Sequence, residues 1–339
     1  MPDASLGLLI FIVVLAVGFG VVNGFNDAAN AIAPAIGTRA LSPRNALIIA
    51  VIANMAGAAT GTLVAKTIGK GILVPEAITY LTVIAALISI IIWGTLATKL
   101  GLPISLHHGF IAGLAAAGMA VMGGEAVVWG VMVRILSAVG IAPLLGFTGG
   151  FVVMICLYWI LRRVAPDRVR RVFGRLQYLT TAFMAYSHGK NDGQMPIGVI
   201  MMALVIYYND PGLWDRLSIF NSGLWWVIVV SALAISSGMA LGGWKVIKTV
   251  GMRVTTMRPV HGFTAHVAAA TVIEIASQAG MPVSTTHCIN AAVMGVGATK
   301  RLSAVRWGIA GNIVTAWILT FPICGVLGYL FAWILYAMF

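Results

Sequence analysis

Charged residues are scarce in this chain of 339 residues: lysine, arginine, aspartate and glutamate make up 9% of it, whereas 60% is apolar. A soluble domain carries about 25% charged residues, so the composition excludes a soluble globule. The apolar residues form runs that approach or reach the roughly 20 helical residues that cross a bilayer, without the alternation of membrane β-strands. These runs are Leu6–Val22, Ala46–Val64, Ala77–Ala97, Ala142–Leu161, Leu224–Met239, Val305–Phe321 and Ile323–Met338. They predict an all-α integral membrane protein, a polytopic helical bundle of about 10–12 membrane segments.

Several signatures of chemistry are also absent from the sequence. It contains neither His-Glu-x-x-His nor Gly-x-x-x-x-Gly-Lys-Ser/Thr, which argues against an intramembrane metalloprotease and an ATP-driven pump. Cys156, Cys288 and Cys324 show no metal-binding spacing and are expected to be buried free thiols. Leu6–Val22 has no basic region before it and no small-residue cleavage site after it, so we expect a retained helix rather than a signal peptide. Neither an enzyme nor a cofactor is expected.

The few charges are mostly basic, with 21 lysines and arginines against 9 acidic residues and a net charge of +12. They lie in short connections between apolar runs, which indicates membrane topology and argues against a nucleic-acid partner. The densest cluster lies between Arg162 and Arg175 and predicts that residues 162–177 are cytoplasmic. Asn209–Asn221 is then expected outside, while the side of residues 299–306 stays open. We expect a multi-pass protein of the plasma (inner) membrane.

Two motifs occur twice. Gly24–Asp27 (Gly-Phe-Asn-Asp) recurs as Gly189–Asp192 (Gly-Lys-Asn-Asp), and Gly101–His108 recurs as Gly280–His287. Two later landmarks repeat in the same order, Trp129-Gly130 with Trp307-Gly308 and Ala142-Pro143 with Phe321-Pro322. A chance recurrence of four landmarks in order is improbable, so the sequence indicates an internal duplication.

Paired motifs of this sort are typical of secondary transporters, in which inverted repeats bring equivalent motifs together near the bilayer midplane. We expect a first repeat over residues 1–161, the basic loop 162–177, and a second, inverted repeat over 178–339, with about 14 additional residues in Asn209–Asn221. Pro103 and Pro282 suit the starts of paired half-helices in hairpins. Rocking one group of helices against the other would expose a shared site to each side in turn.

Small polar residues follow both prolines. The hydroxyls of Ser105, Ser284, Thr285 and Thr286 stand at expected half-helix starts, where free backbone N–H groups and the helix dipole attract anions. Two facing half-helices would thus hold one oxyanion. The alternative is that these hydroxyls only cap helices or bond to a carbonyl one turn back.

Each Asn-Asp motif places a carboxylate within an apolar segment, where an unpaired charge is costly. Asp27 and Asp192 are therefore candidate ligands of Na⁺, together with the amides of Asn26, Asn30 and Asn191, because a hard cation prefers oxygen. The same carboxylates could carry protons instead. Gln194 is a candidate for the substrate and could also supply oxygen to the cation. A purely structural role, with an aspartate paired to Lys190 or to a helix end, is the alternative.

Histidines follow both hydroxyl motifs. His108 and His287 each stand three residues after a serine, where an imidazole could orient the site, donate to the anion or titrate. The alternative is a satisfied histidine between packed helices. Glu274 is a lone acid in an apolar stretch and is expected to pair with His266 two turns earlier.

Taken together, the segments Gly24–Ala31, Ser187–Gln194 and Pro282–His287 resemble the inorganic phosphate transporter (PiT) family, and the resemblance extends over essentially the whole chain. It implies an inverted-repeat transporter that imports inorganic phosphate, driven by a gradient of Na⁺ or H⁺. It also implies that the Asn-Asp motifs serve the coupling ion and that the hydroxyl motifs on paired half-helices serve the anion. A single chain and a homodimer are both compatible with it.

One departure from the family pattern concerns the first hydroxyl motif. Relatives usually carry further small polar residues after Ser105, whereas this chain has Leu106 and His107. Phosphate near neutral pH keeps a proton that it can donate to Asp27 or Asp192, and sulfate has none, so the carboxylates favour phosphate. The altered motif leaves a sulfate permease of the same family as the alternative. A passive anion channel is a further alternative, which gradient-driven accumulation would exclude.

Overall fold

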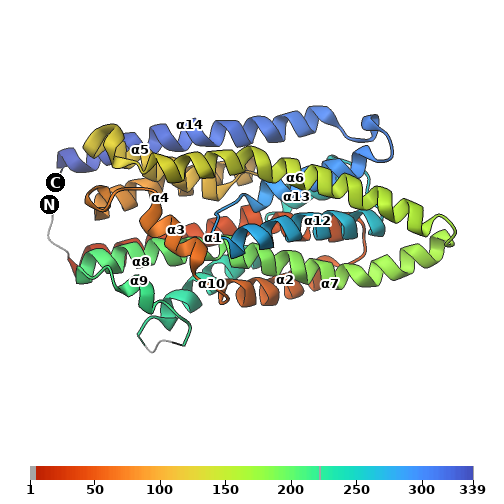
Figure 1. Cartoon of the computed structure of the whole chain (residues 1–339), viewed down its shortest axis with the longest axis horizontal. Helices are drawn as coiled ribbons and strands as arrows, with labels where there is room; N and C mark the ends of the chain where they lie inside the picture. Colours follow the sequence, from red (N-terminus) through yellow and green to blue (C-terminus); the bar gives the residue numbers. More distant parts are fainter. Residues whose placement is uncertain (1–4, 221–222, 339) are drawn as a thin grey trace.

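The computed structural model describes residues 5–220 and 223–338, and helices make up most of this part of the chain (Figure 1). The predicted all-helical fold is confirmed. The α-helices are α1 (Leu6–Gly37), α2 (Pro43–Ala58), α3 (Leu63–Gly71), α4 (Tyr80–Leu100), α5 (Leu106–Met122), α6 (Trp129–Leu161), α7 (Pro166–Asp192), α8 (Gln194–Tyr208), α9 (Leu213–Arg216), α10 (Trp225–Leu241), α11 (Trp244–Lys248), α12 (Pro259–Gln278), α13 (Thr285–Ala298) and α14 (Trp307–Met338). Short turns of other helix types are Pro75–Ala77, Gly123–Ala126, Thr249–Arg253 and Leu302–Ala304.

Five helices of the described chain are long and apolar enough to cross a membrane: α1, α4, α5 with the turn that follows it, α6 and α14. The number rises to 7 if two bent pairs each form one span. In these pairs α2 meets α3 at 64° and α10 meets α11 at 62°. The expected ten to twelve segments also include α7, α8, α12 and α13, which are shorter or carry more polar residues.

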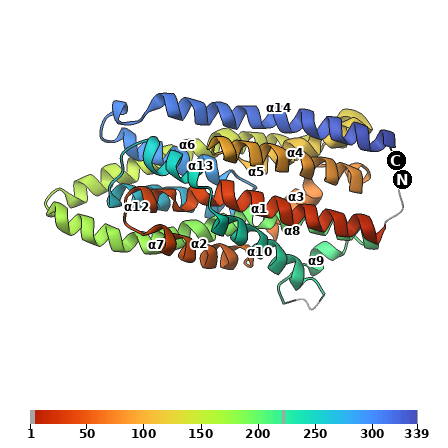
Figure 2. The ribbon, with the colours of Figure 1, turned by 180° about the vertical axis from the view of Figure 1, so that it is seen from behind.

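The first helix of each half runs in the opposite direction from its counterpart. Figures 1 and 2 show α1 leaving the end of the molecule where both termini lie, and α7 followed by α8 returning toward that end. The interruption in this returning segment lies at Gly193, between α7 and α8. Pro196 explains it in part, because its ring nitrogen cannot donate to the carbonyl of Asp192 one turn earlier.

Two hairpins, α4–α5 and α12–α13, occupy equivalent places in the two halves. Gly101 and Gly280 begin the connections with φ of 74° and 66°, a left-handed conformation that favours glycine. The second helix of each hairpin packs along the last long helix of the other half, so α5 lies against α14 and α13 against α6. The two halves are therefore joined at their centre by these hairpins.

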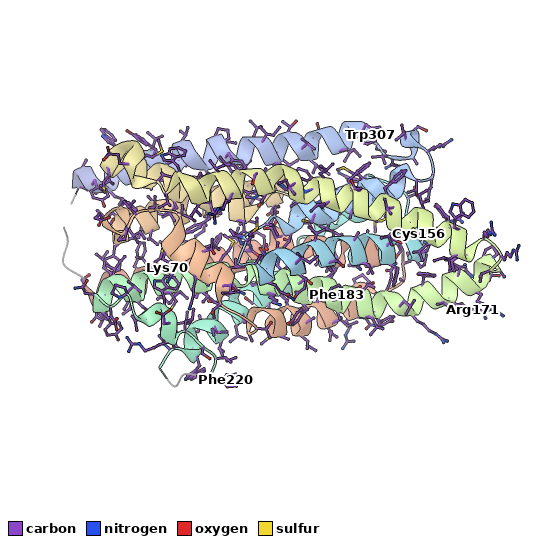
Figure 3. The ribbon with its side chains drawn as sticks, in the orientation of Figure 1. Lys70, Cys156, Arg171, Phe183, Phe220 and Trp307 are labelled. Carbon is purple, nitrogen blue, oxygen red and sulfur yellow. The ribbon has the colours of Figure 1, made fainter. Side chains whose placement is uncertain are left out.

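Some local expectations differ from the structure. Residues 162–177 are helical from Pro166 onward, because proline suits the first turn and the arginines that follow are good helix formers. The run Ala46–Val64 bends between α2 and α3, while the runs on either side of Pro322 join in one helix, α14. Cys288 and Cys324 are buried free thiols, but Cys156 lies on an outer face of α6, which lipid would cover (Figure 3).

The segment expected to carry the additional residues joins α8 to α10 and contains the short helix α9. Asn221 at its end lies outside the described residues, as do residues 1–4 and 339 at the ends of the two expected repeats.

Close packing of α7 against α2 predicts a sharp effect of one methyl group. A Cβ at Gly189 would lie 2.0 Å from the Asn54 carbonyl oxygen, so Gly189→Ala must push the two helices apart. We expect a lower thermal unfolding temperature in detergent, corresponding to about 1–3 kcal/mol of overpacking. Gly174→Ala in the same helix is the control, since nothing lies within 4 Å of its Cβ. Equal unfolding temperatures for the two variants would contradict the prediction.

Candidate functional site

A cluster of polar side chains lies at the centre of the molecule, where the middle of α1 and the end of α7 meet the starts of α5 and α13. None of the site residues predicted from the sequence is more than 2% exposed. Polar groups buried to this degree require partners, and these partners define the site.

Asn26 and Asn191 bind the two hairpin connections by equivalent hydrogen bonds. Asn26 Nδ2 donates to Thr98 Oγ1 at 2.6 Å and to the Leu102 carbonyl at 3.2 Å, and its Oδ1 accepts from the Ile104 N–H at 3.2 Å. Asn191 Nδ2 donates to Ser277 Oγ at 2.8 Å and to the Met281 carbonyl at 3.3 Å, and its Oδ1 accepts from the Val283 N–H at 3.4 Å. Both Nδ2 protons are used, so each amide holds a hairpin in place.

Asp27 follows Asn26 directly and contacts both half-helix starts. Its Oδ2 accepts from the Leu106 N–H at the start of α5, at 3.2 Å. Its Oδ1 accepts a short hydrogen bond from Thr286 Oγ1 at the start of α13. Asn30 Nδ2 donates to the same Thr286 oxygen at 2.9 Å. The carboxylate of the first half is therefore surrounded by N–H, hydroxyl and amide groups.

Asp192 makes the corresponding contacts in the second half, with histidines in addition. Thr285 Oγ1 donates to its Oδ2 at 3.1 Å. His107 Nδ1 lies 3.3 Å from Oδ1, and His188 Nε2 lies 3.3 Å from Oδ2. His107 and Thr286 are equivalent positions of the two hairpins, so each half supplies one side chain to the other half's carboxylate.

The hydrogen bond that His188 makes to Asn54 implies that a proton lies between the His188 ring and Asp192. Its Nδ1 lies 2.7 Å from Asn54 Oδ1, an acceptor, so Nδ1 carries a proton. In a neutral imidazole Nε2 would then be unprotonated and would face the carboxylate with a lone pair. A favourable contact at 3.3 Å therefore requires a proton on either Nε2 or the Asp192 carboxyl.

His108 and His287 face each other across the centre. Their ring centroids are 5.0 Å apart, His108 stacks on Phe321 at 5.2 Å, and His287 stacks on Trp317 at 4.0 Å. Within residues 5–220 and 223–338 the ring nitrogens of both histidines have no hydrogen-bond partner. Aromatic stacking thus orients both rings while their polar atoms stay available to a ligand.

The two serines cap their own helices, as the alternative interpretation expected. Ser105 Oγ accepts from the His108 N–H at 3.3 Å, and Ser284 Oγ accepts from the His287 N–H at 3.0 Å. A hydroxyl that accepts one bond keeps its own proton for another acceptor, so each serine can cap its helix and still donate to an anion. Gln194 lies apart from these contacts, because its Oε1 accepts from the Ala65 N–H and its Nε2 donates to the Lys190 carbonyl.

Two histidines beside Asp192 were not predicted as site residues, and one acid was paired wrongly from the sequence. His107 and His188 contact Asp192 directly, and the four-residue spacing of His188 and Asp192 on one helix face was the available signal. Glu274 pairs with Lys190, not with His266, whose Nδ1 lies 3.4 Å from Thr180 Oγ1. Lys190 reaches Glu274 from a neighbouring helix, a contact that spacing within one helix could not reveal.

The chain is similar to known phosphate transporters. A model of the phosphate transporter family matches residues 23–328. A probable low-affinity inorganic phosphate transporter of Bacillus subtilis is 37% identical over 99% of this chain and 100% of its own length. One of Rhizobium meliloti is 36% identical over 94% of this chain and 95% of its own. A solved structure titled as the sodium-dependent phosphate transporter superposes with a TM-score of 0.87 and 25% identity, covering 98% of this chain and 100% of that one.

The fold and the family match define a multi-pass membrane transporter, which confirms the expectation that the protein is not an enzyme. The chain belongs to the phosphate transporter family. The resemblance noted from the repeated motifs is thereby confirmed.

The asparagine contacts predict a loss of stability when an amide is removed. Asn191→Leu would leave the buried Met281 carbonyl and Val283 N–H without their partner, at a cost of about 1–3 kcal/mol for each unsatisfied group. We expect a lower unfolding temperature in detergent. Asn23→Leu is the control, because Asn23 is equally buried and its amide atoms have no partner in the described part of the chain. A control variant that loses as much stability would refute the assignment.

Proposed function

We propose that this protein is a secondary active transporter that imports inorganic phosphate across the plasma membrane, coupled to a gradient of Na⁺ or H⁺. The observation that carries the proposal is the buried centre, where two carboxylates and two half-helix starts from opposite halves meet. A site that bound only an anion would gain nothing from Asp27 and Asp192 beside it, since negative charge repels an anion. A coupled site needs them for the co-transported cation.

The anion would lie between the half-helix starts of α5 and α13. Ser105 and Ser284 offer hydroxyl protons there, and His108 and His287 offer ring nitrogens that have no partner among residues 5–220 and 223–338. The positive ends of two helix dipoles add to this. Phosphate near neutral pH still carries a proton that it can donate to a carboxylate, which favours it over sulfate in this environment.

The two carboxylates differ in a way that supports different roles in coupling. Asp27 accepts from the Leu106 N–H and from the Thr286 hydroxyl, and its carboxylate together with that hydroxyl offers the oxygen ligands that Na⁺ prefers. Asp192 lies between His107 and His188, and its contact with His188 requires a proton on either the carboxyl or the imidazole. We therefore assign Na⁺ to Asp27 and a proton to Asp192, with Asn26 and Asn191 positioning the hairpins.

Two equivalent vestibules support alternating access. One, of about 330 Å³, is lined by Phe25, Thr98 and Lys245. The other, of about 420 Å³, is lined by Lys190, Ser277 and Leu63. Each is lined by the hydroxyl that binds one asparagine of the site, Thr98 in one and Ser277 in the other. Because the two halves run in opposite directions, equivalent vestibules open toward opposite ends, and each could lead to the site from one side of the membrane.

Removal of either carboxylate charge tests the coupling. We expect Asp27→Asn and Asp192→Asn each to abolish gradient-driven phosphate uptake into proteoliposomes, because the driving cation or proton loses its ligand. Incorporation and unfolding temperature are measured for both variants to show that the protein is present and folded. Uptake close to that of the unsubstituted protein, by either variant, would rule out the assigned role of that aspartate.

The substrate and the driving ion can be tested in one assay. Radiolabelled phosphate uptake is measured under an imposed sodium gradient, a proton gradient or neither, with and without excess sulfate. We expect accumulation that requires an ion gradient and resists sulfate. Phosphate that only reaches the same concentration on both sides of the membrane would indicate a channel. Phosphate uptake that excess sulfate abolishes would indicate a sulfate permease, with His107 at the altered motif.

A further inference from the structure

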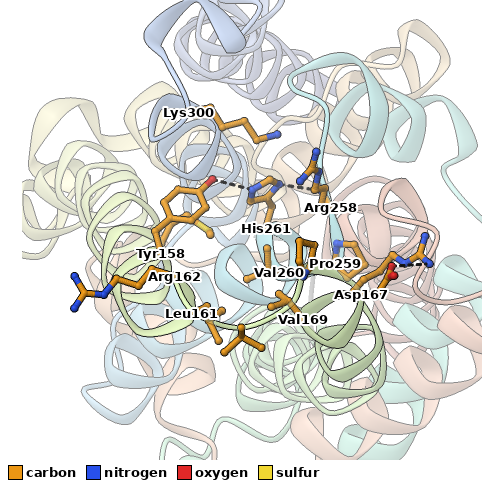
Figure 4. Close-up of a pocket in the computed structure, with 14 residues that line it drawn as sticks. Tyr158, Leu161, Arg162, Asp167, Val169, Arg258, Pro259, Val260, His261 and Lys300 are labelled. Carbon is orange, nitrogen blue, oxygen red and sulfur yellow. Dashed lines mark hydrogen bonds and ion pairs between the residues drawn. The ribbon is translucent and has the colours of Figure 1, made fainter.

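A further cavity lies at the end of the molecule where α6 turns into α7, and Figure 4 shows the residues that line it. It has a volume of about 720 Å³. Its walls are the end of α6, the start of α7, the start of α12 and the residue Lys300 beyond α13. This end carries the arginine cluster, including the projecting Arg171, and is the end predicted to be cytoplasmic (Figure 3).

Besides Arg162, whose guanidinium lies over the Trp159 ring, the cavity contains a pair of cations, Arg258 and Lys300, without a counter-ion among the described residues. Asp167, its one carboxylate, lies 3.3 Å from Arg170, so these two charges offset each other. Neither Arg258 nor Lys300 forms an ion pair with a described residue, and Lys300 Nζ donates one hydrogen bond, to the Thr256 carbonyl at 2.7 Å (Figure 4). Partial burial and the nearby Arg258 charge lower the pKa of Lys300. A bound anion would offset the Arg258 charge and favour the charged form of Lys300.

A neutral donor, the Tyr158 hydroxyl, also lines the cavity, across the His261 ring from Arg258 (Figure 4). His261 Nδ1 accepts from the Arg258 N–H at 2.9 Å, so the proton of the neutral imidazole is on Nε2. That proton is donated to the Tyr158 hydroxyl oxygen at 3.1 Å. The Tyr158 O–H is thereby left free to donate to a ligand. An anion here would find three kinds of donor: an ammonium, a guanidinium and a phenol.

The remaining walls are apolar. Met154, Leu161, Val164, Val169 and Val260 line the cavity beside the cations. Trp159 and Ile160 at the end of α6 are exposed next to it, as expected of a helix surface that lipid covers. The cavity is therefore amphipathic, with cations on one side and an apolar wall that continues toward the membrane.

We propose that this cavity binds a phosphate group, at Arg258, Lys300 and Tyr158, separately from the transported anion. The phosphate belongs either to an anionic phospholipid, whose glycerol and acyl groups would lie on the apolar wall, or to free phosphate on that side of the membrane. Arginine and lysine are the usual phosphate donors in proteins, and juxtamembrane basic clusters attract anionic lipid.

The test compares two variants that lose the same charge. Arg258→Gln with Lys300→Gln removes the cavity's cation pair, whereas Arg163→Gln with Arg171→Gln removes two arginines at the same end that do not line the cavity. Binding of phosphatidylglycerol to the purified full-length protein is measured by native mass spectrometry. Binding of inorganic phosphate is measured by equilibrium dialysis in lipid-depleted detergent.

We expect the cavity variant to bind one of these ligands about tenfold more weakly, as the loss of charge-assisted bonds implies, while the control variant changes little. Weakened phosphatidylglycerol binding identifies a lipid as the source, and loss of one class of phosphate sites identifies free phosphate. Equal behaviour of the two variants toward both ligands would overturn the proposal. Tyr158→Phe, which keeps every charge, should weaken binding of the same ligand to a smaller degree. It replaces the double variant as the test if the double variant does not fold.

Discussion

The amide side chains of Asn26 and Asn191 hold the centre of this protein together. Each binds the same three groups of one hairpin, two acceptors and one backbone N–H. The aspartate that follows each asparagine in the chain is thereby placed next to the half-helix starts. In an apolar interior these bonds have no water to replace them, so the hairpins and the carboxylates are fixed relative to each other.

Within this common frame the two halves have become chemically different. His188 stands where the first half has Asn23, and His107 stands where the second half has Thr286. Both histidines lie beside Asp192, whereas Asp27 accepts from the Thr286 hydroxyl and the Leu106 N–H. Equivalent geometry with unequal chemistry supports two carboxylates that bind different partners, a cation and a proton.

Much of this could be predicted because the decisive signals are local and occur twice. The repeated Asn-Asp and Pro-x-Ser motifs identified the carboxylates and the half-helix starts, and the apolar runs identified the class of protein. Contacts between distant segments could not be predicted, since nothing near Lys190 in sequence indicates Glu274. The helical start of α7 was missed because a high density of arginine predicts exposure and does not distinguish a loop from a solvated helix.

The exchange of hairpins between the halves also constrains how the site can open. Because α5 packs along α14 and α13 along α6, a movement of either half-helix start would also move the long helix that it contacts in the other half. Gly113 and Gly328 meet in one of these contacts, and Gly146 and Gly150 lie against α13 in the other, so backbones approach closely with little side chain between them. Such contacts resist separation. Opening of either vestibule is therefore expected to move each hairpin and its long helix together as a rigid pair.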